Sequence, residues 1–333
     1  MKGFLCSVLA MVVFLFADMN AVSLQAAPLQ LKINTISATD SPWHKAMLKF
    51  SEIVKTKSKG GIEVLVYADG QLGDISQTLT AMQMGTVDMG YFGLGSAIYL
   101  KPYSAISIIY VPYLFKDKVQ ATRILNSPVF NEIYDKAAKE SGVRIFSAYG
   151  ARSPRAIQTT KGPINKPEDL KGMKLRIPGM EIFLATFRAL DVKPMSLPMT
   201  EIYMALQQGV VEGQDNGFDL AIPLKFHEVA KFWCATDHVY EVTGWFISEK
   251  LWNKLSSDEK MILMEAARES GQLATDLVEK LDQDAIEILK RSGCTYTVPD
   301  KEAFKKVWAD VYKQFEGKTW PEGMVEKIQA MQK

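Results

Sequence analysis

Histidine, cysteine and an excess of either charge are scarce in this chain of 333 residues. It contains three histidines and three cysteines, and 39 Lys and Arg residues balance 38 Asp and Glu residues to a net charge of +1. A near-neutral chain lacks the basic surface that neutralises nucleic-acid phosphates, and so few cysteines cannot build a disulfide scaffold. The composition excludes both classes and is typical of a globular protein long enough for two domains.

Long apolar runs are also absent, except at the N-terminus. Lys2 precedes an apolar run over residues 4–17, and small residues follow at 21–27. The run is shorter than the roughly 20 residues of a membrane-spanning helix, which favours a signal peptide over a retained anchor. Cys6 lies at the start of the run, whereas a lipoprotein cysteine would follow it. We therefore predict a signal peptide over residues 1–26, cleaved within 21–26.

Two cysteines, Cys234 and Cys294, remain after this cleavage. An exported protein can form a disulfide, and a bridge requires Cα atoms within about 7 Å of each other. The sequence leaves two alternatives open: one bridge, or two separate buried thiols.

The mature chain begins with alternating strands and helices. Polar and apolar residues alternate over 29–33, which predicts a strand. Ser41 and Pro42 then provide an N-cap and a first helical residue, and a glycine pair at 60–61 ends that helix. Further strands are predicted over 62–67 and 87–92, so this part of the chain predicts a parallel sheet covered by helices.

The alternation starts again after residue 143. Strands are predicted over 143–149, 156–160, 173–177 and 195–197, with helices over 180–190 and 201–208. No low-complexity linker separates this unit from the first. We therefore expect two α/β units joined by a hinge of strands that cross between them.

A long helical pattern without proline extends over residues 257–291. A helix of that length would reach about 50 Å and extend across both units. The alternative is two helices broken near Ser270 and Gly271, because an interior glycine weakens a helix by about 1 kcal/mol.

Catalytic motifs are few. His44, His227 and His238 fit no common zinc spacing, and neither GxGxxG, a Walker A motif nor GxSxG occurs. Ser257 matches SxxK in form, but the acidic residues after it are typical of a helix N-terminus. We predict no catalytic residue, no metal site and no cofactor.

The arginines are more informative. Arg176 interrupts an apolar strand, and strand alternation directs it to the face opposite its apolar neighbours. A buried guanidinium requires an anion, either an internal carboxylate or a bound one. Arg155, at the start of a nearby strand, adds weight to a bound carboxylate, and Arg152 is a competing candidate.

Asn216 is a further candidate for ligand binding. It follows the predicted helix over 201–208, at the end of a glycine-containing strand and loop. Open α/β sheets bind ligands at such places, and an asparagine offers both a donor and an acceptor. The alternative is an Asx turn.

At these residues the sequence resembles the substrate-binding proteins of TRAP transporters, the tripartite ATP-independent periplasmic carriers. The resemblance rests on LKGMKLRIP at 170–178 and MTEIYMALQQGVVEGQDN at 199–216. It is supported by GQLG at 70–73, GTVDMG at 85–90 and VPYLF at 111–115. It covers the mature chain from about residue 29 to the final helices.

The resemblance implies a periplasmic-binding-protein-like clamshell of two α/β domains, with a hinge of crossing strands and a long helix spanning both. We assign residues 27–152 plus about 242–281 to domain I, and 153–241 plus about 282–333 to domain II. Such a protein is a monomer in the periplasm that captures an organic acid in the interdomain cleft. It delivers this acid to the membrane subunits of the transporter and is not an enzyme.

The resemblance also implies the binding residues. Arg176 matches the family arginine that pairs with the ligand carboxylate, Arg155 matches a second family arginine, and Asn216 matches the family asparagine. A bound carboxylate at Arg176 is thereby favoured over an internal one. A contact between Arg152 and the ligand stays open.

One departure from the family bears on the substrate. Many of its sugar-acid binders carry a glutamate where this chain has Ile75. Trp43, Tyr91, Phe92 and Phe218 also lie in segments expected to face the cleft. Together these residues favour a carboxylate with an apolar or aromatic body. The alternatives are a uronate or other sugar acid, and an exported enzyme that acts on small organic acids.

Overall fold

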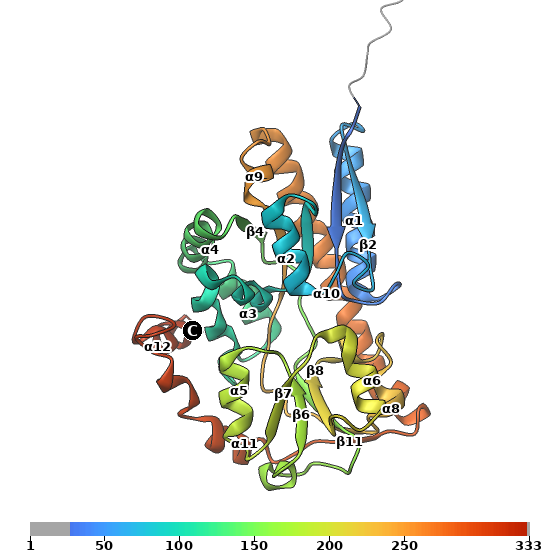
Figure 1. Cartoon of the computed structure of the whole chain (residues 1–333), viewed down its shortest axis with the longest axis vertical. Helices are drawn as coiled ribbons and strands as arrows, with labels where there is room; N and C mark the ends of the chain where they lie inside the picture. Colours follow the sequence, from blue (N-terminus) through green and yellow to red (C-terminus); the bar gives the residue numbers. More distant parts are fainter. Residues whose placement is uncertain (1–26, 332–333) are drawn as a thin grey trace, which may run out of the picture.

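The structure is a computed structural model that describes residues 27–331. The predicted signal peptide, residues 1–26, lies outside the described residues. Two sheets with their helices lie one above the other in Figure 1 and form the two domains of a clamshell. No helix within residues 27–331 combines the length and the apolar character that crossing a membrane requires.

The first domain is built on a five-stranded sheet in the order β2-β1-β3-β10-β4. The predicted strands β1 (Leu29–Asn34), β2 (Ile62–Tyr67) and β3 (Met89–Gly93) are confirmed and run parallel. However, β10 (Thr243–Ser248) lies antiparallel between β3 and β4 (Val143–Ser147). The sheet is therefore mixed, where the sequence predicted a parallel one, because a strand from late in the chain completes it.

Helices with strong end signals cover the first sheet. α1 (Pro42–Lys57) begins after Ser41, whose side chain accepts a hydrogen bond from the backbone of His44. α2 (Ile75–Met84) begins after Asp74 with a capping box and ends at Gly85, whose φ of 78° suits glycine. The remaining elements here are η1 (Leu94–Tyr99), η2 (Lys101–Tyr110), α3 (Lys118–Leu125), α4 (Pro128–Ser141) and α9 (Glu249–Trp252).

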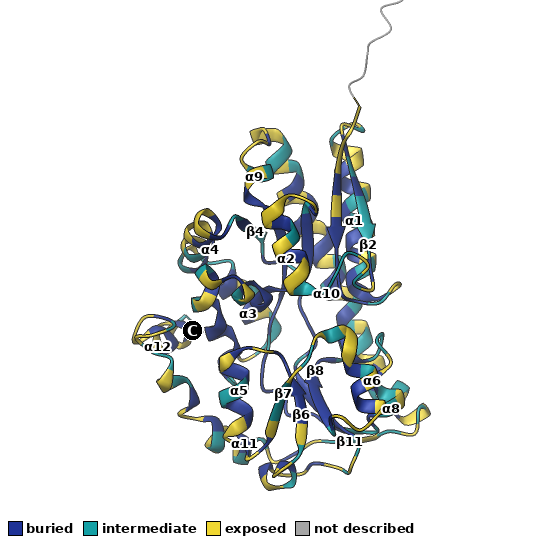
Figure 2. Cartoon of the chain, viewed as in Figure 1, coloured by how far each residue is buried: buried dark blue, intermediate teal, exposed yellow. Residues whose placement is uncertain are grey.

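The second domain is built on a six-stranded sheet in the order β11-β9-β5-β8-β6-β7. The strands are β5 (Ala156–Thr159), β6 (Lys174–Ile177), β7 (Lys193–Ser196), β8 (Gly213–Asn216), β9 (Phe232–Cys234) and β11 (Thr295–Thr297). Its helices are η3 (Pro167–Leu170), α5 (Glu181–Arg188), η4 (Met199–Glu201), α6 (Ile202–Gln207), α7 (Phe218–Ala221) and α8 (Phe226–Val229). Figure 2 shows the buried residues concentrated on the strands and on the helix faces that cover them.

Two extended segments cross between the sheets. One joins β4 to β5 and the other joins β9 to β10, and they meet in an antiparallel bridge between Ala151 and Val242. Figure 1 shows both passing between the domains. The predicted hinge of crossing strands is confirmed.

α10 (Ser257–Arg291) is one unbroken helix of 35 residues. Its first half packs against α1 and its second half against α7 and β11, so it spans both domains. Gly271 does not break it. A Cβ added at Gly271 would lie 2.6 Å from the Cβ of Tyr149, so the glycine permits a close approach of the hinge segment to the helix.

The C-terminal segment returns to the first domain. α11 (Lys301–Trp308) lies on the second domain, where the Trp308 indole donates to the carbonyl of Thr186 at 2.8 Å. After η5 (Val311–Gln314), α12 (Met324–Ala330) lies beside the first-domain helices, and Arg123 of α3 donates to the carbonyl of Met331 at 2.8 Å. The predicted boundary, with 282–333 in domain II, did not anticipate this return.

Cys234 and Cys294 are both free thiols. Cys234 is buried in β9, whereas Cys294 donates to the carbonyl of His227 at 3.3 Å. Of the two alternatives left by the sequence, the structure has separate thiols.

Candidate functional site

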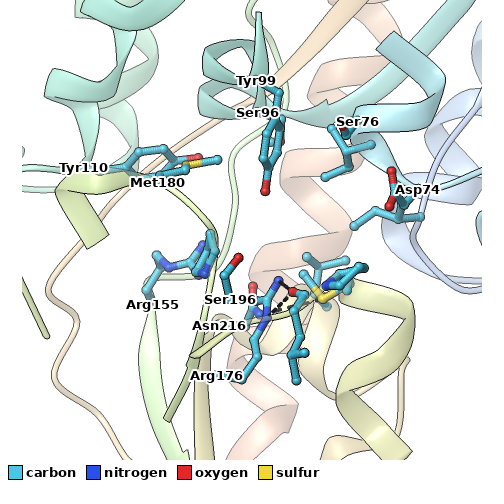
Figure 3. Close-up of a pocket in the computed structure, with 18 of the residues that line it drawn as sticks. Asp74, Ser76, Ser96, Tyr99, Tyr110, Arg155, Arg176, Met180, Ser196 and Asn216 are labelled. Atoms are coloured by element: carbon cyan, nitrogen blue, oxygen red, sulfur yellow. Dashed lines mark hydrogen bonds between the residues drawn. The ribbon is translucent and has the colours of Figure 1, made fainter. Parts of the chain in front are cut away.

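A cavity of about 180 Å³ lies between the two domains. Figure 3 shows its wall, with Ser96 and Tyr99 of the first domain on one side and Arg176 and Asn216 of the second domain on the other. Tyr99 points from η1 toward the second domain. The size suits a small molecule, and the interdomain position is typical of ligand sites.

Arg176 is a buried cation in this wall. β6 places it on the cavity face, and its side chain is 3% exposed. Its Nε and Nη2 donate to the carbonyl of Leu197 at 2.9 and 2.7 Å, and Nη1 has no hydrogen-bond partner among the described residues. Burial lowers the pKa of Arg176 to about 10, so the group is still charged at neutral pH. Within residues 27–331 no carboxylate pairs with it.

Asn216 ends β8 beside Arg176. β6 and β8 are parallel, and Arg176 is in register with Gln214, so Arg176 and Asn216 share a face of the sheet. Asn216 is fully buried, and its Nδ2 donates to Gln214 Oε1 at 2.8 Å. Its Oδ1 has no partner among the described residues. The cavity wall thus combines an unpaired donor and an unpaired acceptor.

Arg155 lines the same cavity, but its charge is compensated. Its Nε and Nη2 donate to the carboxylate of Asp215 at 2.7 and 2.6 Å, and its Nη1 donates to Glu241 at 2.9 Å. Burial would raise the pKa of Asp215, yet the adjacent Arg155 holds it well below its usual range. Arg155 therefore differs from Arg176, which has no internal counter-ion in the described chain.

Arg152, which also lines the cavity, forms a second buried ion-pair group. It donates to Asp219 at 2.8 Å and to Glu241, and its guanidinium carbon lies 4.9 Å from the ring centroid of Trp43. The Trp43 indole in turn donates to Asp219 at 3.2 Å. A first-domain aromatic side chain is thus tied to an acidic residue of the second domain.

The N-terminus of α2 contributes polar and apolar groups to the opposite wall. Asp74, Ile75 and Ser76 all line the cavity. One oxygen of Asp74 caps the helix by accepting from the backbone of Gln77 at 2.8 Å. The apolar side chain of Ile75 is therefore flanked by a carboxylate and a hydroxyl.

Most of the residues predicted for the site lie in the wall of this one cavity. These are Arg176, Arg155, Asn216, Trp43 and Ile75, together with the competing candidate Arg152.

Three predicted aromatic residues lie elsewhere. Tyr91 is fully buried in β3 with its ring centroid 4.1 Å from that of Trp245, and Phe92 is fully buried in the same strand. Phe218 stacks on Trp233 at 5.4 Å within the second domain. Tyr91 and Phe92 fill the core of the first domain, whose sheet is covered on both faces, and Phe218 is partly buried in α7. None of the three lies in the cavity wall, where the sequence analysis expected them.

Several wall residues were missed by the sequence analysis, among them Tyr99, Tyr110 and Ser196. Tyr99 and Tyr110 end two consecutive 3-10 helices, and Ser196 ends a short strand. Such segments lack a regular hydrophobic period. The repeated tyrosines over 99–110 were the one sequence feature that could have indicated that this segment lines the cavity.

Residues 33–318 match a family of known proteins, the bacterial extracellular solute-binding proteins of family 7. The chain belongs to this family. A solute-binding protein of Roseobacter denitrificans is 32% identical over 286 residues, 86% of each chain. The sialic acid-binding periplasmic protein SiaP of Vibrio cholerae is 28% identical over 314 residues, 93% of this chain and 95% of its own. The resemblance to the TRAP solute-binding proteins is thereby confirmed.

Solved structures of the family share the fold. A TRAP periplasmic solute-binding protein of Roseobacter denitrificans with bound L-galactonate has a TM-score of 0.83 at 28% identity, covering 91% of this chain and 98% of its own. One from Ochrobacterium anthropi with bound L-fuconate has a TM-score of 0.86 at 27% identity, covering 92% and 100%. The two-domain clamshell is confirmed, and these relatives are binding proteins rather than enzymes.

Proposed function

We propose that this solute-binding protein captures a small hydroxylated organic acid and that Arg176 holds its carboxylate. The observation that carries the proposal is the buried Arg176 guanidinium, which lacks an internal counter-ion and has a free Nη1. A buried charge without a partner is strongly unfavourable. A ligand carboxylate supplies both the missing charge and the missing acceptor, in the geometry that suits a guanidinium.

Arg155 and Asn216 are proposed as secondary contacts. Since Arg155 is held by Asp215 and Glu241, it offers a fixed donor rather than an uncompensated charge. Asn216 lies on the same sheet face as Arg176 and provides a neutral contact. The affinity should therefore depend most steeply on Arg176.

The ligand body is proposed to be hydroxylated rather than aromatic. The expectation of an aromatic body rested partly on three rings that lie outside the cavity wall. The wall opposite Arg176 instead offers hydrogen-bonding groups from Asp74, Ser76, Ser96 and Tyr99. The relatives with L-galactonate and L-fuconate support the sugar-acid alternative.

Capture is proposed to proceed by closure of the clamshell. The carboxylate first meets Arg176 in the second domain, and the first domain then closes over the ligand about the crossing segments. The lobes are residues 27–152 with about 242–281, and 153–241 with about 282–333 apart from α12. The ligand stabilises the closed form by its greater affinity for it. The mature protein, exported by means of a signal peptide that is then cleaved, delivers the bound acid to the TRAP membrane subunits.

Calorimetry on the mature protein tests this function. Galactonate, fuconate and galacturonate are titrated into the wild type, Arg176→Lys and Arg176→Met, with Arg188→Met, an exposed arginine of α5, as control. We expect both Arg176 variants to bind at least about 100-fold more weakly, since neither methionine nor lysine can form the two-pronged contact of a guanidinium with a carboxylate. Normal binding by Arg176→Met would overturn the assignment, and mass spectrometry of the ligand released on denaturation would identify the natural acid.

A further inference from the structure

Three buried amide side chains form a connected row beneath the cavity. They belong to Gln158 of β5 and to Gln214 and Asn216 of β8, and all three are fully buried. Gln158 is in register with Gln214 across the antiparallel pair, so the row lies on one face of the sheet.

The backbone fixes the orientation of the first amide. Gln158 Nε2 donates to the carbonyls of Ala156 and Asn216 at 2.9 and 2.8 Å. A carbonyl can only accept, so the nitrogen of Gln158 must face these two groups and its oxygen must face Gln214. The orientation of every later amide in the row follows from this one.

The order continues to Asn216. Gln214 Nε2 donates to Gln158 Oε1, which turns Gln214 Oε1 toward Asn216. Asn216 Nδ2 donates to that oxygen at 2.8 Å and lies 3.8 Å from the sulfur of Met199. Asn216 Oδ1 is therefore the atom left without a partner in the described chain.

The unpaired acceptor lies close to the unpaired donor of Arg176. Because Arg176 is in register with Gln214, Asn216 is its diagonal neighbour on the adjacent parallel strand, at a typical separation of about 8 Å between Cα atoms. One carboxylate and the carbon beside it can contact both side chains. A carboxylate satisfies Arg176 Nη1 but cannot donate to Asn216 Oδ1.

We propose that this site selects acids with a hydrogen-bond donor on the carbon next to the carboxylate, namely 2-hydroxy acids. Gln214 and Gln158 are positioning residues for this selectivity, because they hold Asn216 with its oxygen available. The inference rests on the function proposed above. A 2-deoxy acid leaves Asn216 Oδ1 unsatisfied, and a 2-oxo acid sets two acceptors against each other.

Matched ligand sets test the selectivity by calorimetry. One set is galactonate with its 2-deoxy and 2-oxo analogues, and the other is 2-hydroxyisocaproate with 4-methylvalerate and 4-methyl-2-oxovalerate. In whichever set binds, we expect the hydroxy acid to bind about 10- to 100-fold more tightly than its two analogues. An analogue that binds as tightly as its hydroxy acid overturns this inference and leaves the Arg176 carboxylate site standing. Failure of every acid in both sets to bind overturns both.

Variants of the amide row test its role. In Gln214→Leu the Asn216 amide is free to turn, so the preference for the hydroxy acid should fall to within about threefold, with the 2-oxo acid gaining affinity. If Gln214→Leu does not fold, Gln158→Leu is used in its place. It removes the amide whose orientation the backbone fixes and should lower the preference for the hydroxy acid to the same extent. Thr159→Val, which removes a buried hydroxyl of the same sheet outside the row, should keep the full preference. An unchanged preference in folded Gln214→Leu or Gln158→Leu overturns the positioning role.

Discussion

The indole of Trp43 donates a hydrogen bond of 3.2 Å to the carboxylate of Asp219. Trp43 lies in the first turn of α1 in one domain, and Asp219 lies in α7 of the other. Arg152 bonds the same carboxylate at 2.8 Å and packs against the indole. Because the two domains each supply one partner, this bond forms only when the domains approach each other.

The first prediction follows from this contact. Trp43→Phe keeps an aromatic ring but loses the N–H, so the closed form should lose about 0.5–1.5 kcal/mol and the ligand affinity about 3- to 10-fold. Calorimetry with the sugar acid that binds the wild type measures the effect. Trp233→Phe is the matched control, since its indole donates within the second domain to Ala230. Equal losses of affinity in both variants would contradict a role in closure.

Arginine replacements in the cavity should have opposite effects on stability. Arg176→Met removes a buried charge without an internal counter-ion, so the free energy of unfolding without ligand should rise by about 1–3 kcal/mol. Arg155→Met removes the cation that pairs with Asp215 and Glu241, so it should lower the free energy of unfolding by about 3–5 kcal/mol. Urea denaturation measures both. Changes of the same sign would show that Arg176 is compensated after all.

Two adjacent residues of α10 should also respond in opposite directions. Ser270 is fully buried with a hydroxyl that has no partner among the described residues, so Ser270→Ala should stabilise by about 0.5–1 kcal/mol. Gly271→Ala would place its Cβ 2.6 Å from Tyr149 and should destabilise by about 1–3 kcal/mol despite the better helix propensity of alanine. Thermal and urea denaturation measure both changes. If Gly271→Ala were stabilising, the hinge segment at Tyr149 would have to move away to make room for the added methyl group.

Asp282 of α10 should make stability depend on pH. Burial raises the pKa of Asp282 to about 6, although Ser153 donates to it and Lys118 of α3 lies 3.6 Å away. Asp219 of α7 and Glu279 of α10 are the nearby acids. The folded state therefore holds this proton more tightly than the unfolded state. The contribution of Asp282 to stability is greatest below about pH 4 and falls by about 2–3 kcal/mol as the pH rises through 6.

Asp282→Asn removes this titration. The difference in the free energy of unfolding between the wild type and Asp282→Asn should therefore fall between pH 4 and 7, as measured by urea denaturation at each pH. Asp276→Asn, an exposed change on the same helix, should show no comparable trend. A pH-independent difference for Asp282→Asn would refute the shifted titration.

Local patterns predicted much of this molecule. Ser41 begins α1 as a side-chain cap normally does, and Arg176 reaches the cavity because strand alternation fixes its face. The family resemblance then indicated the clamshell and brought Arg155 and Asn216 to the same site.

Long-range pairing was beyond the local patterns. The insertion of β10 beside β3 depends on contacts between strands far apart in sequence, and so do the carboxylates that compensate Arg155. Tyr91 was misjudged for a related reason. When a sheet is covered on both faces, alternation separates its two faces but cannot tell a cleft from a core.

The continuous helix α10 bears on the closure proposed above. Its two halves are fastened to different domains, and no break interrupts its 35 residues. Rotation of one domain must therefore appear as curvature of this rod, shared among many backbone hydrogen bonds rather than concentrated in one joint. The further one domain rotates relative to the other, the more strongly the bent helix opposes the rotation. If the domains close as proposed, the stiffness of a helix that does not line the cavity should help to set the rate at which the acid is released.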